Sequence, residues 1–411
     1  MPTQPSAHRF TPAFVRLAWS NLAAQSAEQI SLAAVPIVAV LLLGAGPGQI
    51  GALSTVQTLP FLLLAIPFGL LADRTSRRRL RVGAEALRAL SLLGLLLALM
   101  GGWVSIPGLA VLGLFGAVGT VGFSVTAPAL VPQLVPGAAL AQANGRLELA
   151  RSAAFTAGPA LAGALVAWSG ASAAFVLASA LSVAAVLLLT GIAEPARVLA
   201  PARHPLIELR EGAALAWHHP LLRAILMCSV AWNIAWFVLQ AAYVPYAVRV
   251  LGMSADAIGA SLACYGVGMV LGALLAPRIV AALPFGRAVL VGPAMSVLGM
   301  ALMVATLAWP SALLAALAYF TFGAGPILWT ITSTTLRQTV TPAALIGRVS
   351  AIVVTVSVGS RPIGAAIGGF VGAKWGEAAC LWLAFAVFGL QAAIIFASPV
   401  RGLARLPVSV N

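Results

Sequence analysis

Twelve apolar stretches follow one another along this chain, and each is long enough to form a helix that crosses a lipid bilayer. Glycines, prolines and short clusters of arginine separate them. Because 61% of the 411 residues are hydrophobic and only 8% are charged, a water-soluble domain could not cover its surface with polar groups. The sequence therefore excludes a soluble globular protein, a disordered chain and a disulfide scaffold, and it predicts an all-α polytopic membrane protein.

One polar connection divides the expected spans into six and six. We expect an N-terminal six-helix bundle over residues 1–192, a cytoplasmic central loop over 193–220 and a C-terminal six-helix bundle over 221–411. The first apolar stretch is too long for a cleaved signal peptide, so it is interpreted as the first span. The predicted spans cover residues 14–43, 48–73, 79–101, 106–134, 138–168, 170–192, 221–250, 255–281, 286–307, 310–336, 343–373 and 376–399.

The net charge of +14 first suggests a nucleic-acid binder, but the placement of the charges does not. With the N-terminus in the cytoplasm, twenty of the 23 basic residues fall in cytoplasmic loops or at the helix ends beside them. The outer loops hold only Arg249 and Lys374, with the acids Asp256 and Glu377 nearby, and Arg361 lies inside a span. This asymmetry predicts a multi-pass protein of the bacterial inner membrane with both termini in the cytoplasm, facing lipid and not nucleic acid.

The two halves repeat in sequence. Residues 133–140 resemble residues 338–345, and both segments are followed by a Gly–Arg pair and a proline in a Gly/Ala-rich helix. Upstream, residues 50–52 match residues 258–260. Matching segments of the two halves are separated by about 203–208 residues throughout. Since six spans per copy is an even number, the copies share one orientation, which indicates a parallel repeat about an axis along the membrane normal.

A loop motif lies between the second and third expected spans, where the sequence reads Gly69-Leu-Leu-Ala-Asp73-Arg74-Thr-Ser76-Arg77-Arg78-Arg79. It resembles the motif Gly-x-x-x-Asp-Arg-x-Gly-Arg-Arg of the major facilitator superfamily, with Ser76 in place of the second glycine. The resemblance covers essentially the whole chain. It implies twelve transmembrane helices in two parallel six-helix repeats and a monomeric transporter, not an enzyme. It also implies a gating role for Gly69, Asp73, Arg74, Arg77 and Arg78, with a solvated loop that only maintains topology as the alternative.

The fifth expected span carries a second motif. Gly158, Pro159 and Gly163 match part of the Gly-x-x-x-Gly-Pro-x-x-Gly-Gly motif of the superfamily's drug antiporters, and alanine fills the other two glycine positions. Small residues let helices approach closely and proline bends a helix, so a packing seam is the alternative interpretation. The residues around 60–61, 144–145 and 347–348 resemble the subfamily of macrolide efflux pumps, the enterobactin exporter and lysophospholipid transporters, the drug:proton antiporter-3 group.

Ionisable groups inside a span are costly and mark candidate functional sites. In the first span, Asn21, Gln25, Glu28 and Gln29 share one helical stripe. Glu28 lies about halfway along, where a carboxyl group that gains and loses protons could couple transport; a neutral glutamic acid bonded within the bundle is the alternative. Glu148 is a second proton-coupling candidate, although an ion pair with Arg151 on the same helix is the simpler interpretation.

Charged residues also occur in the third and eleventh expected spans. Arg361 is alone in its span beside Pro362 and needs a partner, which Glu28 or an anionic substrate could provide. Glu85 and Arg88, at the start of the third span, are predicted to form an ion pair at the membrane boundary.

Aromatic and amide side chains form one face of the seventh span, and polar residues cluster in the tenth. The resemblance implies that spans 1, 4, 7 and 10 line a central cavity, and such a lining suits a bulky amphipathic solute. Some rings could instead belong to interfacial belts. The predicted cavity residues are Gln25, Gln29, Trp232, Asn233, Trp236, Gln240, Tyr243, Trp329, Thr332, Ser333 and Arg361.

These features together predict a secondary active transporter that exports a small amphipathic molecule, such as a drug or siderophore, in exchange for protons. The sequence has no phosphate-binding loop of the Walker type, and the spans carry no nucleophile–base pair and no metal-ligand set. We therefore expect no enzymatic activity, no cofactor and no metal. A lysophospholipid flippase, a nutrient importer and a transport-inactive sensor or scaffold are the alternatives.

Overall fold

The computed structural model describes residues 11–135, 140–192, 205–342 and 345–407, and every regular element in these ranges is helical. Side-chain oxygens of Thr11, Ser76 and Ser105 accept hydrogen bonds from the first turns of three helices, which fixes where those helices begin. The helices of the N-terminal half are α1 (Pro12–Leu43), α2 (Pro47–Arg74), α3 (Arg77–Met100), α4 (Ile106–Leu134), α5 (Leu140–Ser169) and α6 (Ala171–Thr190).

The C-terminal half repeats this pattern with helices of similar length. Its elements are α8 (Pro220–Arg249), α9 (Ala255–Ala282), α10 (Phe285–Ala305), α11 (Ala312–Val340), α12 (Ile346–Gly359), α13 (Arg361–Phe396) and the short 3₁₀ helix η3 (Pro399–Gly402). The predicted spans agree with the observed helices to within a few residues at most ends. The prediction of an all-α fold is confirmed.

The last two spans are joined by a reversal of the chain inside α13. Gly376 has a φ of 81°, in the left-handed region that glycine adopts without the steric cost of a Cβ atom. The thiol of Cys380 lies 3.2 Å from the carbonyl oxygen of Gly368, so the segments on the two sides of Gly376 pack against each other. The first part of α13 continues α12 across a bend at Ser360, and these two pieces together form the eleventh span.

The connection that the sequence predicts as a loop over 193–220 contains a helix, α7 (Pro205–His218). Residues 193–204 lie outside the described part of the chain. Gly212 and Ala216 are buried on one face of α7, and a Cβ atom at Gly212 would lie 2.8 Å from the backbone of Arg348. Glu211 forms an ion pair with the same arginine. The short apolar face is therefore held by contact with α12, which sequence periodicity alone does not reveal.

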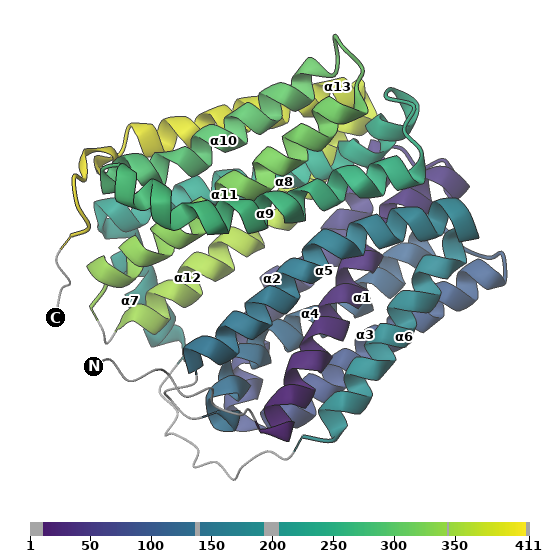
Figure 1. The fold of residues 1–411 in the computed structure, drawn as a ribbon, viewed down its shortest axis with the longest axis horizontal. Coiled ribbons are helices and arrows are strands. Elements are labelled where there is room, and N and C mark those ends of the chain that lie inside the picture. The colour runs from purple at the N-terminus through teal and green to yellow at the C-terminus, as the bar shows by residue number, and fades with distance from the viewer. Residues whose placement is uncertain (1–10, 136–139, 193–204, 343–344, 408–411) are drawn as a thin grey trace, which may run out of the picture.

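Helix ends alternate between two faces of the molecule. We call the face with the start of α1 and helix α7 the terminal face, and the face with the turns at Gly44 and Gly376 the opposite face. Figure 1 shows α1–α6, purple to teal, as one group and α8–α13, green to yellow, as the other. Among the described residues, 11 segments are long and apolar enough to cross a membrane. The last, Ile346–Phe396, has 51 residues and holds two spans, so the total is twelve.

Glycines bring the two halves into contact near the opposite face. A Cβ atom at Gly51 of α2 would lie 2.3 Å from the Cα atom of Gly369 in α13, and one at Gly163 of α5 would lie 2.8 Å from the Cα atom of Gly259 in α9. Backbones approach this closely only where neither residue has a side chain. Gly51 and Gly259 occupy equivalent positions in the sequence repeat, so the two contacts are related by the pseudo-symmetry of the fold.

Arg249, at the end of α8, also joins the halves at the opposite face. Its Nη2 atom donates to the carbonyl oxygens of Gly44 at 2.9 Å and Ala45 at 3.1 Å, and its Nη1 atom lies 3.3 Å from Oε1 of Glu377. The sequence placed Asp256 near this arginine, but its carboxylate partner comes from α13. Arg249 thus links the α1–α2 turn to two elements of the C-terminal half.

We expect Arg249→Gln to make the opposite face open more often. The measurement is the rate at which a membrane-impermeant maleimide labels a Ser54→Cys variant that lacks the native cysteines, because Ser54 lines the central cavity. Two lost charge-assisted bonds of about 1 kcal/mol each predict an increase of roughly thirtyfold. The matched control is Glu377→Gln, which removes only the ion pair and should raise the rate about twofold at most. Equal rates in the two variants would contradict a role for the bonds to Gly44 and Ala45.

Candidate functional site

A cavity of about 710 Å³ lies between the two halves. Its walls come from ten helices, α1–α5 of the N-terminal half and α8, α9, α11, α12 and α13 of the C-terminal half. Glu28, Arg88, Asn233 and Arg361 line it, and each lies close to the middle of its span. The cavity is therefore centred at mid-membrane depth, with walls from more helices than the four that the family resemblance implies.

Most of the residues predicted for the cavity line it, and three do not. Gln25 of α1 is not part of the lining. Thr332 and Ser333 are buried in α11, where the Thr332 hydroxyl donates to the carbonyl oxygen of Leu328 in its own helix at 2.9 Å. The eight predicted cavity residues that line it are Gln29, Trp232, Asn233, Trp236, Gln240, Tyr243, Trp329 and Arg361. Glu28 and Pro159, which were predicted for proton coupling and helix packing, line it as well.

Aromatic rings form the wall of the cavity on the side of the C-terminal half. Trp232 and Trp236, one turn apart on α8, are stacked with ring centroids 5.4 Å apart and planes inclined by 10°. Tyr265 of α9 and Tyr319 of α11 pack against Trp236 at 5.3 Å and 5.8 Å. The Tyr319 hydroxyl donates to Oε1 of Gln240 at 2.8 Å, which fixes the polar end of this wall. The wall offers flat apolar surface with few polar atoms.

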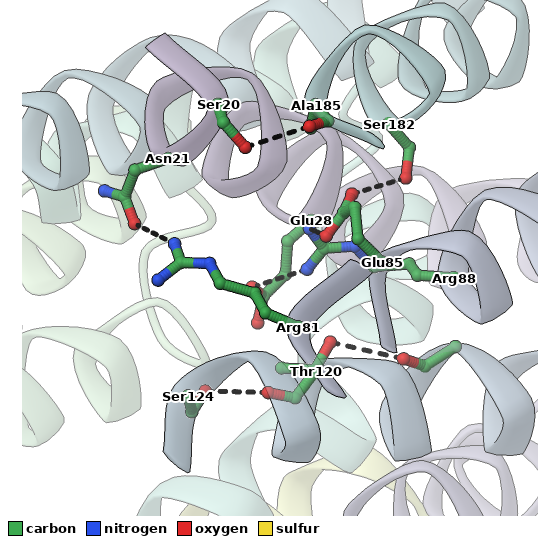
Figure 2. Close-up of polar contacts among 11 residues, drawn as sticks. Ser20, Asn21, Glu28, Arg81, Glu85, Arg88, Thr120, Ser124, Ser182 and Ala185 are labelled. Carbon is green, nitrogen blue, oxygen red and sulfur yellow. Dashed lines mark hydrogen bonds and ion pairs between the residues drawn. The ribbon is translucent and has the colours of Figure 1, made fainter. Parts of the chain in front are cut away.

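A network of charged side chains fills the N-terminal side of the cavity and the bundle behind it (Figure 2). Arg88 of α3 is its centre: one nitrogen lies 3.3 Å from Oε2 of Glu28, and another binds the carboxylate of Glu85 on the same helix. The other oxygen of Glu85 accepts a hydrogen bond of 2.6 Å from Ser182 of α6. The Glu85 side chain is 0% exposed, whereas that of Glu28 is 19% exposed. Arg88 therefore joins a fully buried carboxylate to one that faces the cavity.

Arg81 extends the network toward the terminal face. Its Nη2 atom donates to Oδ1 of Asn21 at 3.3 Å, and its guanidinium carbon lies 4.0 Å from the centroid of the Phe123 ring. Arg88 lies on the same ring at 5.3 Å. A ring face attracts cations, so Phe123 stabilises two arginines that the apolar bundle would otherwise disfavour.

The ion pair predicted between Glu85 and Arg88 is present, but its predicted place at the membrane boundary is wrong. Both side chains, and that of Arg81, are buried inside the N-terminal bundle. The three residues lie one turn apart on one face of α3, from which their side chains contact residues of α1, α4 and α6. That spacing was the available signal, but proximity to the cluster of arginines at the start of α3 favoured the boundary interpretation.

Glu148 and Arg151 form the ion pair expected from their spacing, at 2.5 Å along α5. The Glu148 side chain is 55% exposed and lies outside the cavity lining, whereas Arg151 lines the cavity and sits 5.5 Å from the ring centroid of Phe155. Arg151 thus reaches the cavity with its charge already matched by a carboxylate.

The loop motif is described only in part. Ser76, which replaces the family's glycine, caps α3 by accepting a hydrogen bond of 3.1 Å from the Arg79 amide, and Arg78 donates to the Ile192 carbonyl at the end of α6 at 2.8 Å. Both contacts hold the start of α3 in place. The side chains of Asp73, Arg74 and Arg77, and the surroundings of Gly69, lie outside the described residues.

The glycines of the fifth-span motif lie in helix contacts. A Cβ atom at Gly158 would lie 2.5 Å from the Cβ atom of Gln29 in α1, and Gly163 meets Gly259 of the other half. Pro159 contributes to the cavity lining between them. This arrangement is that of a packing seam which passes beside the cavity.

The comparisons with known proteins agree with this geometry. A family model described as Major Facilitator Superfamily matches residues 17–365. The uncharacterized MFS-type transporter y4rN of Sinorhizobium fredii (strain NBRC 101917 / NGR234) is 31% identical over 283 residues. That match covers 66% of each chain, just under two thirds.

Solved structures share the fold at low sequence identity. The nucleoside transporter NupG matches with a TM-score of 0.73 and 13% identity, over 94% of this chain and 98% of that one. A D-xylose–proton symporter matches with a TM-score of 0.74 and 15% identity, over 93% and 97%. A bacterial homologue of the iron transporter ferroportin, in an inward-facing state, matches with a TM-score of 0.70 and 17% identity, over 93% and 98%. At these identities the likeness concerns the fold alone.

Proposed function

Because the chain belongs to the Major Facilitator Superfamily, we propose that it is a secondary transporter that exports amphipathic small molecules in exchange for protons. The resemblance to the drug:proton antiporter-3 group supports the exporting direction. In this proposal the terminal face is cytoplasmic, as the distribution of basic residues predicts, and the membrane is the bacterial inner membrane. The two halves alternate access by rocking about the central cavity.

One observation carries the coupling: Glu28 faces the cavity at mid-membrane and shares Arg88 with a second carboxylate. When Glu28 takes up a proton, its ion pair with Arg88 is lost, but Arg88 keeps the buried Glu85 as its counter-ion. Protonation of Glu28 therefore does not leave Arg88 without a counter-ion, which lowers the free-energy cost of that protonation in an apolar bundle. Glu28 is the exchangeable acid and Glu85 the fixed one.

Glu148, the second acid considered for coupling, has a different role in this proposal. Its carboxylate is exposed beside Arg151 and lies outside the cavity lining, so a solute in the cavity does not contact it. We assign it to positioning Arg151. This difference makes Glu148 the matched control for Glu28.

The test uses proteoliposomes that contain a trapped pH dye and carry a pH gradient. Amphipathic probes are added one at a time: erythromycin, 2-naphthoate, 2-naphthamide and 2-naphthylmethylammonium. We expect at least one to drive proton movement in the wild-type protein. Glu28→Gln should reduce that movement about tenfold or more, within the range for loss of a positioned proton-transfer group, while Glu148→Gln should retain it. Unchanged proton movement in Glu28→Gln would overturn the coupling role.

The alternatives give different results in the same vesicles. Movement of a lysophospholipid without a pH gradient would select the flippase. Entry of protons together with a probe would select the importer. Absence of any movement across the panel would select a transport-inactive sensor or scaffold.

A further inference from the structure

Arg361 is a cation that lines the cavity without a carboxylate at ion-pair distance. Its Nε atom donates to Oδ1 of Asn233 at 3.0 Å, and its guanidinium carbon lies 5.6 Å and 5.8 Å from the ring centroids of Phe237 and Phe61. The amide nitrogen of Asn233 donates to the Ser229 carbonyl at 2.9 Å, which turns the Asn233 oxygen toward the arginine. Within the described ranges no acid lies within ion-pair distance of Arg361.

The other two arginines of the cavity lining have acidic partners. Arg88 is shared between Glu85 and Glu28, and Arg151 is paired with Glu148. Among the described arginines of the lining, Arg361 is therefore the one with no carboxylate at ion-pair distance, and the charge of Glu28 acts on it only from farther away. A cation without a contacting counter-ion in a low-dielectric cavity attracts an anion more strongly than it would in water.

A second unused donor lies in the same cavity. The indole nitrogen of Trp232 is buried and has no hydrogen-bond acceptor among the described residues, although an indole N–H is a donor that a buried site normally satisfies. Trp232 precedes Asn233 on α8, so this donor and the group that orients Arg361 come from consecutive residues. The terminal nitrogens of Arg361 and the indole nitrogen of Trp232 are therefore both available to hydrogen-bond an acceptor on a solute.

We propose that the solute is an amphipathic organic anion whose carboxylate, sulfonate or phosphate group binds Arg361. Its apolar body lies on the wall of Trp232 and Trp236, where flat rings stack without a directional polar partner. A guanidinium offers a planar fork of donors that matches such an anion, and the bond of Nε to Asn233 leaves its two terminal nitrogens for this purpose. This inference rests on the proposed function, because it names the substrate class of the same cavity.

A cationic solute fits the described charges poorly. It would have to displace Arg88 from Glu28, and it would lie in the same cavity as the positive charge of Arg361. A neutral solute would leave the Arg361 charge and the Trp232 donor unsatisfied. Of the three classes, only an anion supplies both a counter-charge for Arg361 and an acceptor for the Trp232 indole N–H.

The test measures binding to the full chain in phosphatidylcholine nanodiscs, without a gradient. Tritiated 2-naphthoate is displaced by unlabelled 2-naphthoate, by neutral 2-naphthamide or by 2-naphthylmethylammonium, which share one ring system and differ in charge. We expect the anion to bind at least about tenfold more tightly than the amide, a ratio in line with the loss of one buried charge-assisted bond. Lysophosphatidate is a further competitor. Displacement of 2-naphthoate by lysophosphatidate at lower concentration than by unlabelled 2-naphthoate would identify a lipid head group, and not a soluble anion, as the anion that the site binds.

Variants at Arg361 distinguish an anion site from a structural role. Arg361→Gln should abolish the preference for 2-naphthoate while leaving the affinity for 2-naphthamide within about twofold, and Arg361→Lys should restore most of the preference because it keeps the charge. Arg278→Gln is the matched control, since it removes one positive charge from an exposed position of the same half outside the cavity lining. An equal loss of preference in Arg278→Gln, or a preference that survives in Arg361→Gln, overturns the assignment.

The binding results are separable from those on coupling. Equal affinity for the three naphthyl probes overturns the anion site and leaves proton-coupled transport at Glu28 intact. Anion-selective binding with protons that move in the same direction as 2-naphthoate supports the anion site and overturns the exporting direction.

Discussion

Glu85→Ala is expected to cost the protein about 3–5 kcal/mol of folding free energy, the range for removing one partner of a buried ion pair. The Glu85 carboxylate is fully buried, binds Arg88 and accepts a hydrogen bond of 2.6 Å from Ser182. Without it, Arg88 retains only the 3.3 Å contact with Glu28, and the Arg81 guanidinium, one turn away, lies in a bundle with one negative charge fewer. Two arginines would then share a single carboxylate away from water.

The measurement is the amount of monodisperse protein that survives heating in detergent, read by size-exclusion chromatography. We expect the apparent melting temperature to fall most in Glu85→Ala and less in Glu85→Gln, which keeps an acceptor for Ser182. The control is Glu148→Ala, because that carboxylate pairs with an arginine three residues on but is 55% exposed. An exposed pair of this kind contributes about 0.5 kcal/mol. Equal melting temperatures for the two alanine variants would contradict a structural role for the buried network.

The positions of the spans could be predicted because length and hydropathy determine them. The span predicted at 106–134 is helix α4, and Ser105 caps it where a polar residue precedes an apolar run. The reversal between the last two spans falls at Gly376, within the predicted boundary. The helix α7 could not be predicted in the same way, because its short buried face depends on a contact with α12.

The candidate site could be predicted where a polar stripe stands out against an apolar helix. Such a stripe lies on α8, where Trp232, Asn233, Trp236 and Gln240 all line the cavity. The residues on α3 were missed for a physical reason. In the first half of a span that begins with a cluster of arginines, the sequence does not distinguish a side chain that reaches the lipid head groups from one that turns into the bundle. The distinction depends on two contacts, that of Arg88 with Glu28 of α1 and that of Glu85 with Ser182 of α6. Only the tertiary structure brings these residues together.

The glycine contacts could be predicted from the sequence only in part. The repeat predicts that Gly51 and Gly259 are equivalent, but it does not predict what they contact. In the structure each packs against a glycine of the opposite half, Gly369 for Gly51 and Gly163 for Gly259. The two contacts close the opposite face, and neither leaves space for a methyl group. A side chain at either position therefore opposes closure without touching the cavity.

Gly51→Val is accordingly expected to hold the opposite face open and to reduce transport roughly 100-fold, as a cost of about 3 kcal/mol to the closed state implies. Spin labels at Trp103→Cys and Trp309→Cys, exposed positions in loops of the two halves at that face, should report a longer mean distance than in the parent protein. Gly389→Val is the control, because a Cβ atom there meets nothing within 4 Å while the cost to helix propensity is the same. Wild-type distances and transport in Gly51→Val would show that the opposite face does not close through this contact.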